Sequence, residues 1–294
     1  MCDARIAERL KEELIIGEPG TITGLKIRAA FPAVFKRAYP ALDPKTEMLP
    51  AVSLLRFHEI DALPLAFGAD KHQRRRAVFG FSCLAKLRQM GPAEFGEFLK
   101  RPCEEASEEL STIDADEDVR DLLRVFSTTH FGFAMVENRH EEGGLITLAD
   151  VLGLYDTGVI RSHLVVGDVA SPIFSMPGKT RLKEVLREMY ERAYRRVFIS
   201  GGRVFVSDRA IITHVFSPAV LTRLARGSSD VLDTPLSAIE RSEPRSVPVD
   251  TSLKQAASTL TAMRGQTLVC EKGVVTPWDV VMEPWRAKAL GIRK

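Results

Sequence analysis

Four stretches of the chain repeat one spacing of apolar residues. Counted from Thr46, Glu117, Thr180 and Thr251, the residues at +2, +5, +6 and +9 are apolar in every copy. This spacing forms one face of an α-helix, and a turn rich in Pro, Asp and Gly precedes each copy, so the pattern predicts four amphipathic helices. The residues of the four faces are Met48, Ala51, Val52, Leu55, Val119, Leu122, Leu123, Phe126, Leu182, Val185, Leu186, Met189, Leu253, Ala256, Ala257 and Leu260.

Short apolar runs follow the four helices at one distance. They begin at +17 from each starting residue, at 63–65, 134–136, 197–199 and 268–270, and they predict buried strands. A second apolar strand and a further helix come after each run. The starting residues are 71, 63 and 71 positions apart (117 − 46, 180 − 117 and 251 − 180), so a shift of 134 maps the first two copies onto the last two. This repeat predicts a duplicated pair.

The predicted fold is an α/β (α+β) chain of four βαββα-like repeats in two pairs. Residues 1–30 are expected to precede the repeats, with a short helix at 6–17. The first pair covers 31–160, and the second pair covers 161–294. Within each pair, the repeats are expected to share a two-sheet core covered by helices. The four repeats span about 31–92, 100–160, 164–222 and 232–288.

One motif occurs twice, as "GLITLAD" at 144–150 and "GVVTPWD" at 273–279. Its simplest interpretation is helix capping, in which the Thr and the Asp satisfy backbone groups at the start of a helix. The same geometry also suits a ligand. A hydroxyl and exposed N–H groups at a helix start bind phosphate, and a carboxylate one turn later can accept both hydroxyls of a ribose.

Each repeat resembles a cystathionine-β-synthase-type (CBS) domain. The resemblance rests on the two motifs above, on "VGDVASP" at 166–172, on "VDTSLKQAA" at 249–257 and on "DALPLAF" at 61–67. It covers residues 30 to 284 approximately. In that family two domains pack through their sheets into a Bateman module, so the chain resembles two such modules in tandem.

The resemblance implies a ligand that contains adenosine: AMP, ADP, ATP or S-adenosylmethionine. In the family, the Asp holds the ribose, the Thr lies near the phosphate and the adenine enters between strands. No other cofactor is implied. The positions that match are Thr147, Asp150, Thr276 and Asp279, with Thr112, Ile113, Ser246 and Val247 on the adenine side.

The first and third repeats depart from this pattern. Their expected matches to the Thr and the Asp are Ser82 with Ala85, and Ser207 with Ala210, and alanine cannot bind a ribose. The resemblance therefore implies two sites, one for each pair.

Phosphate recognition is expected to separate the two sites. Family members often carry a basic pair before the first inner strand, which is Arg195 and Arg196 in repeat three, and the partner repeat supplies it to the Asp279 site. A solvated turn is the alternative interpretation of these arginines. Repeat one has Asp61 and Ala62 there. The Asp150 site is expected to prefer a less negative ligand, unless a basic residue reaches it: Arg139, His140 or the arginines at 74–76.

Composition limits the class of protein to which the chain can belong. The chain has 294 residues, is 45% hydrophobic and carries a net charge of +2, which is typical of a globular protein rather than a polyanion-binding one. Apolar runs are too short for a membrane helix, and we expect a cytoplasmic protein. Four scattered cysteines match no zinc spacing and are expected to be reduced. Asn138 is the single asparagine, a bias towards heat tolerance.

No arrangement of nucleophile, base or paired carboxylates indicates catalysis, so an enzyme is not expected. The preferred function is a regulatory sensor of adenosine nucleotides that acts on a regulated protein of unknown identity, as a homodimer or a pseudo-dimer formed by CBS packing. One alternative is a ligand-free scaffold in which the motifs are only helix caps. The other is nucleic-acid binding through the basic loop at 71–76, although such loops are usually only solvated.

Overall fold

The repeats are visible in the computed structural model, which describes residues 25–37, 40–58, 60–66, 75–90, 92–137, 144–160, 162–199, 202–226, 230–263 and 267–289. The helix expected at 6–17 lies outside these ranges. The four amphipathic helices are α3 (Met48–His58), α7 (Val119–Thr129), α10 (Leu182–Glu191) and α13 (Leu253–Ala262). All sixteen predicted face residues are buried, with at most 3% of their surface exposed. The helical pattern is therefore confirmed.

Each repeat contributes one small sheet. The predicted inner strands are β1 (Ala62–Pro64), β5 (Phe133–Glu137), β8 (Arg196–Ile199) and β11 (Leu268–Cys270). Each pairs antiparallel with the strand that follows it: β2 (Arg76–Phe79), β6 (Gly144–Thr147), β9 (Phe205–Ser207) or β12 (Gly273–Val275). The second helices start directly behind β2, β6 and β9 and two residues behind β12. They are α4 (Gly80–Gln89), α8 (Leu148–Asp156), α11 (Asp208–Val215) and α14 (Pro277–Ala289).

The third strand differs between repeat one and the others. In repeats two, three and four, β4 (Thr112–Asp114), β7 (Ser175–Met176) and β10 (Arg245–Ser246) pair parallel with the inner strand. In repeat one, this pairing is a single bridge between Leu42 and Leu65. Prolines at 40 and 44 flank Leu42 and have no N–H to donate to a ladder. The sheet of repeat one is completed by β3 (Glu108–Glu109), which pairs with β2.

Four linker segments, 25–30, 101–106, 164–169 and 234–239, dock in the same way onto the amphipathic helices. In each, a carbonyl accepts from the first helical N–H, as Leu25 O does from Val119 N. Each also donates to the carbonyl of a repeat's starting residue, as Ile27 N does to Glu117 O. Thr46, Thr180 and Thr251 accept equivalent bonds, which confirms the four starting residues as equivalent. The segments contain α2 (Ile27–Ala30), α6 (Cys103–Ala106), α9 (Val166–Val169) and η3 (Leu236–Ala238).

The linker segments are exchanged between neighbouring repeats. Segment 25–30 docks onto repeat two, and 101–106 docks onto repeat one; 164–169 docks onto repeat four, and 234–239 onto repeat three. "VGDVASP" thus belongs structurally to repeat four. Residues 25–30, expected to lie outside the repeats, are part of the fold. The remaining elements are η1 (Val34–Lys36), α5 (Pro92–Phe98), α12 (Pro218–Ala225) and η2 (Asp230–Asp233).

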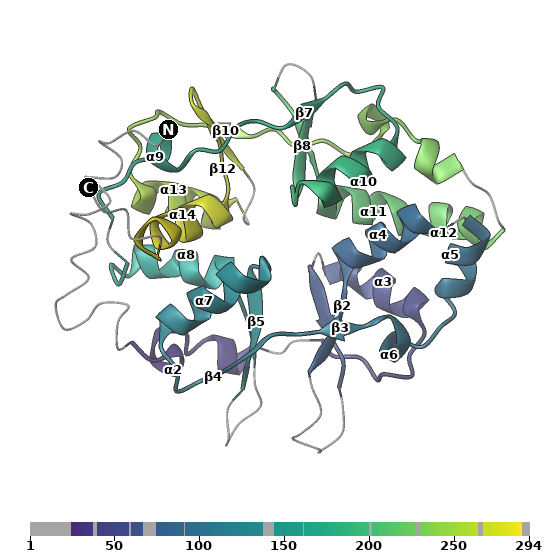
Figure 1. Ribbon diagram of the computed structural model, residues 1–294, viewed down its shortest axis with the longest axis horizontal. Helices are drawn as coiled ribbons and strands as arrows, with labels where there is room; N and C mark the ends of the chain where they lie inside the picture. Colours follow the sequence, from purple (N-terminus) through teal and green to yellow (C-terminus); the bar gives the residue numbers. More distant parts are fainter. Residues whose placement is uncertain are drawn as a thin grey trace. The chain divides into compact units, whose positions relative to one another are not determined.

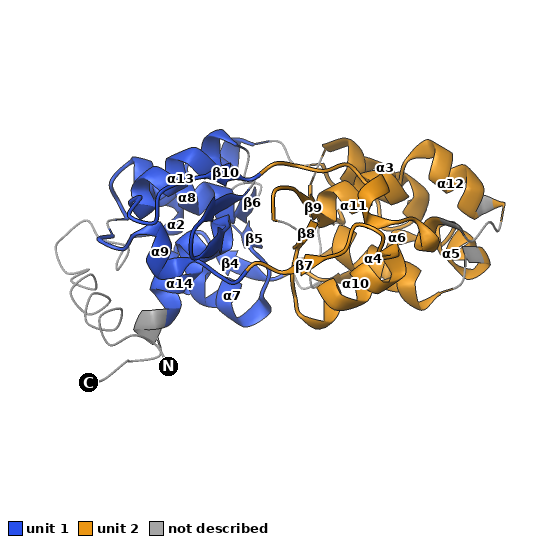
Figure 2. Ribbon diagram, turned by 90° about the horizontal axis from the view of Figure 1, so that it is seen from above, with its two compact units in different colours: residues 1–39, 111–172, 244–294 blue, residues 40–110, 173–243 orange. Residues whose placement is uncertain are grey.

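The chain forms two compact units (Figure 2). Unit 1 contains residues 1–39, 111–172 and 244–294, and unit 2 contains 40–110 and 173–243. Unit 1 therefore joins repeats two and four, and unit 2 joins repeats one and three. The sheet-to-sheet pairing of one with two and of three with four combines residues of different units and stays a prediction.

Helices fill the core of each unit. In unit 1, α7, α8, α13 and α14 pack together (Figure 1). The Tyr155 hydroxyl on α8 donates to the Val280 carbonyl on α14 over 2.9 Å. In unit 2, α4 packs against α10 and α11. Each hydrophobic cluster combines the two repeats of one unit, so the amphipathic faces are buried against helices as well as against their own sheets.

Candidate functional site

Both copies of the repeated motif lie in unit 1, where a strand leads into a helix. The backbone N–H and the hydroxyl of Thr147 both donate to Asp150 Oδ2, each over 2.8 Å. Thr276 donates in the same way to Asp279 Oδ2, over 2.7 Å for both bonds. Helix capping, the simpler interpretation of the motif, is therefore observed in both copies.

The glycine of each motif lets another segment cross close to the strand. A Cβ atom at Gly144 would lie 2.5 Å from the carbonyl oxygen of Val34. A Cβ at Gly273 would overlap the carbonyl oxygen of Ser171, and the φ of Gly273 is +148°. Glycine is required where backbone approaches backbone so closely. The motif therefore positions a crossing segment as well as a helix start.

In each copy, the segment that crosses the glycine, at Val34 or at Ser171, also supplies a side chain that donates a hydrogen bond to the second oxygen of the Asp carboxylate. Arg37 donates from Nη2 to Asp150 Oδ1 over 2.7 Å, and Ser171 donates from its hydroxyl to Asp279 Oδ1 over 2.8 Å. The side chain of Asp150 is 11% exposed, and Asp279 as a whole residue is 6% exposed. In both copies, Oδ2 caps the helix, whereas Oδ1 accepts from a side chain outside it. Oδ1 can also accept a hydrogen bond from a ribose hydroxyl.

Three of the predicted adenine-side residues lie on β4 and β10, in the same sheets as the motifs, and Val247 directly follows β10. Arg245 N and Val247 N donate to the carbonyls of Thr267 and Val269, so the peptide groups of Ser246, between them, point to the open edge of the sheet. Thr112 occupies the matching position on β4. Both side chains are exposed. Ile113 and Val247 instead pack into the core of unit 1, so these two side chains have a structural role.

The first and third repeats lack the carboxylate, as expected, but one alignment is wrong. Ser207 accepts from the N–H of Ala210 and caps α11, which confirms that pair. In repeat one, Phe79 holds the position of Thr147, because Ala62 pairs with Phe79 as Phe133 pairs with Thr147. Ser82 therefore matches Asp150, and Ala85 lies one turn further on. Phenylalanine offers no cap, and serine offers no carboxylate.

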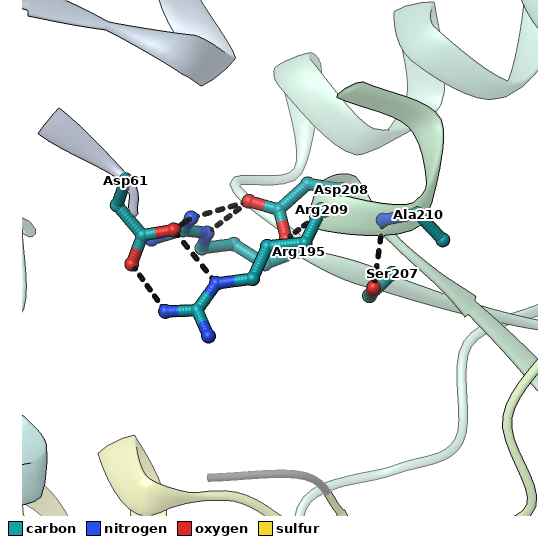
Figure 3. Close-up of polar contacts among 6 residues, drawn as sticks. All are labelled: Asp61, Arg195, Ser207, Asp208, Arg209 and Ala210. Atoms are coloured by element: carbon teal, nitrogen blue, oxygen red, sulfur yellow. Dashed lines mark hydrogen bonds and ion pairs between the residues drawn. The ribbon is translucent and has the colours of Figure 1, made fainter. Parts of the chain in front are cut away.

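Arg195 belongs to a cluster of four charged residues inside unit 2 (Figure 3). Its Nη2 donates to Asp61 Oδ1 over 2.9 Å, and its Nε donates to Asp208 Oδ2 over 2.5 Å. Arg209 binds both oxygens of Asp61, over 3.1 and 3.0 Å. Asp61 and Arg195 are the positions related by the shift of 134. The two residues expected to distinguish the nucleotide sites therefore pair with each other.

The electrostatics of this cluster follow from burial and pairing. Burial alone would raise the pKa of Asp61, but the guanidiniums of Arg195 and Arg209 outweigh it and hold that pKa well below its usual range. Burial alone would lower the pKa of Arg195, yet Asp208 and Asp61 raise it. Two carboxylates thus compensate the charge of Arg195. Arg196 lies on β8, and its contribution to the Asp279 site joins different units and stays a prediction.

Other predicted features fall partly outside the described ranges. Residues 71–74 of the basic loop, Arg139 and His140 lie there. Arg76 is half-buried on β2, and its Nε donates to the Ser107 hydroxyl over 2.7 Å. Among the described residues, no group of three His, Cys, Asp or Glu could hold a metal. Cys83, Cys103 and Cys270 are free and buried, and burial raises the pKa of Cys83 to about 12.

Three charged residues around these sites were not foreseen from the sequence: Arg37, Asp208 and Arg209. Arg37 lies 113 positions from Asp150, and no pattern in its neighbourhood marks it. Asp208 and Arg209 start α11, immediately after Ser207, which caps that helix. An acidic residue in the first turn of a helix is a recognisable signal. It predicts a favourable helix start, but it does not predict an ion pair.

The sequence matches no family model and no curated protein. Among solved structures, MJ1225 from Methanocaldococcus jannaschii, a candidate archaeal homolog of γ-AMPK, aligns with 91% of this chain over its own whole length. The TM-score is 0.73 and the identity 18%. The chain has the fold of tandem CBS domains. At this identity, the likeness to MJ1225 extends to the fold alone.

Two shorter structures align with about half of the tandem CBS fold. The CBS-domain protein ATU1752 from Agrobacterium tumefaciens is 15% identical, with 47% of this chain and 96% of its own covered and a TM-score of 0.37. PAE2072 from Pyrobaculum aerophilum, solved with AMP, is also 15% identical, with 43% of this chain and 89% of its own covered and a TM-score of 0.34.

Over the described residues, no helix is long and apolar enough to cross a membrane.

Proposed function

We propose that the chain is a regulatory sensor that binds adenosine nucleotides or adenosyl compounds at the helix starts marked by Asp150 and Asp279. The observation that carries this proposal is that the two oxygens of each Asp carboxylate have different partners. Oδ2 caps the helix, and Oδ1 accepts from a side chain of a separate segment. A ribose diol can take the place of that donor without breaking the cap.

The surrounding groups suit the rest of such a ligand. The backbone edges of Thr112 and Ser246 offer hydrogen bonds to a base, and the N-termini of α8 and α14 favour a nearby phosphate. Both helices carry a site, and they pack against each other in one core. Ligand binding at one helix start is therefore expected to change the ligand affinity at the other. Through this coupling, the chain would pass ligand occupancy to a regulated partner.

Thermal unfolding with adenosine, AMP, ADP, ATP and S-adenosylmethionine tests the proposal. A ligand at 100 times its dissociation constant adds about 2.7 kcal/mol to the free energy of unfolding, so at least one of the five should raise the melting temperature. The scaffold alternative expects no shift with any of them, together with a stable dimer in sedimentation. A shift that survives in the double variant Asp150→Ala, Asp279→Ala would place the ligand elsewhere.

A further inference from the structure

The described donors to the Oδ1 atoms of Asp150 and Asp279 differ in charge. In the Asp279 copy, the donor to Oδ1 is the neutral hydroxyl of Ser171. In the Asp150 copy, it is the guanidinium of Arg37, which forms an ion pair over 2.7 Å. The caps, the glycines and the strand positions are otherwise matched. The side chain that donates to Oδ1 is therefore a feature that distinguishes the sites.

Displacing the two donors has different consequences. When a ribose hydroxyl replaces Ser171, one neutral donor is exchanged for another. When it replaces Arg37, an ion pair is exchanged for a hydrogen bond from a neutral donor, so the attraction between the guanidinium and the carboxylate is lost. A nucleoside offers the displaced guanidinium no anion in return. A phosphorylated ligand does, because arginine pairs well with phosphate oxygens.

The position of Arg37 allows this exchange of partners. Its backbone follows Val34, whose carbonyl is held against Gly144, so the residue stays beside the site. Its side chain is 48% exposed, whereas that of Asp150 is only 11% exposed. The guanidinium can therefore move to a new partner at the mouth of the site while the carboxylate remains fixed by Thr147.

We propose that Arg37 is the specificity-determining residue of the Asp150 site and makes it select phosphorylated adenosine ligands over adenosine. This inference rests on the proposed function. It reverses the expectation that the Asp150 site, without a basic pair, prefers a less negative ligand.

Calorimetry in the Asp279→Ala background, which isolates the Asp150 site, tests this inference with AMP and adenosine. We expect AMP to bind at least about tenfold more tightly than adenosine. Arg37→Gln should weaken AMP by about tenfold and leave adenosine unchanged or tighter. The matched control is Arg28→Gln, which removes an exposed ion pair with Asp116 from the same segment and should keep the ratio.

The outcomes separate the two proposals. If both ligands bind and Arg37→Gln leaves their affinity ratio unchanged, the specificity role of Arg37 is wrong while the proposed function stands. If Arg37→Gln weakens adenosine as much as AMP, Arg37 is a general contact and not a specificity determinant. If neither AMP nor adenosine binds to the wild-type chain or to the Asp279→Ala chain, the inference about Arg37 is wrong. If ADP, ATP and S-adenosylmethionine also fail to bind, the proposed function is wrong as well.

Discussion

Asp61 binds both arginines of the charged cluster in unit 2. It accepts three hydrogen bonds from Arg195 and Arg209. Asp61→Asn should lower the free energy of unfolding by about 1.5 to 3 kcal/mol, because hydrogen bonds to charged groups contribute about that much. Urea unfolding followed by circular dichroism measures the loss. The control is Asp233→Asn, whose pair with Arg181 is over 60% exposed on both sides and contributes about 0.2 to 1 kcal/mol.

The difference in unfolding free energy between wild type and Asp61→Asn should also depend on pH. The folded-state pKa of Asp61 is depressed, so its contribution is complete above the unfolded pKa, about 3.9, and is lost as the pH falls further towards the folded value. The gap in unfolding free energy between wild type and Asp61→Asn should stay constant from pH 7 to about pH 5 and shrink below pH 4. Equal losses for Asp61→Asn and Asp233→Asn, or a gap that widens in acid, would contradict this account.

The helix caps predicted from the sequence are formed within one turn of chain. Thr147 and Asp150, like Thr276 and Asp279, are three positions apart, so their hydrogen bonds are local and the motif is enough to find them. Arg37 meets Asp150 only through tertiary structure. Ser82 was wrongly matched to Thr147 for a different reason. The longer connection between β1 and β2 hides the register of β2, and only the pairing of Ala62 with Phe79 shows that Phe79 holds that position.

At the scale of elements, the crossing of two segments at Gly273 makes a sharp prediction. Gly273→Ala should destabilise the chain by roughly 1 to 3 kcal/mol, because a Cβ would overlap the Ser171 carbonyl at a φ that L-residues avoid. Gly153→Ala is the matched control: it lies in α8 with nothing within 4 Å of an added Cβ, and it should be neutral or stabilise by up to about 1 kcal/mol. Denaturant unfolding compares them. Similar effects of the two changes would contradict the close crossing.

The elements that were predicted are long enough for their pattern of apolar residues to be detected. The amphipathic helices have 10 or 11 residues, and each inner strand overlaps a continuous apolar run. Strands β7 and β10 have two residues each, and β4 has three, too few for any alternation to show. The exchange of linker segments is also invisible in the sequence, since a four-residue helix carries no signal of which repeat it docks onto.

For the whole molecule, the fourfold repeat and the tandem CBS fold were predictable, but the composition of the units was not. An apolar helix face shows that it is buried and does not show against which helix. The cores join repeats two and four in unit 1, and repeats one and three in unit 2. As a result, both carboxylate sites belong to one unit, and the charged cluster of Asp61 and Arg195 belongs to the other.

The central claim is that unit 1 holds two adenosine sites, one at each Thr-x-x-Asp helix start. Isothermal titration calorimetry with AMP tests it most directly. We predict two sites per chain for the wild type, one after Asp150→Ala or Asp279→Ala, and none in the double variant. Ser207→Ala, which removes a helix cap in unit 2 at a similar cost of about 1 kcal/mol, should retain both sites. A folded double variant that still binds AMP with the wild-type stoichiometry would contradict the claim and leave the two motifs as helix caps.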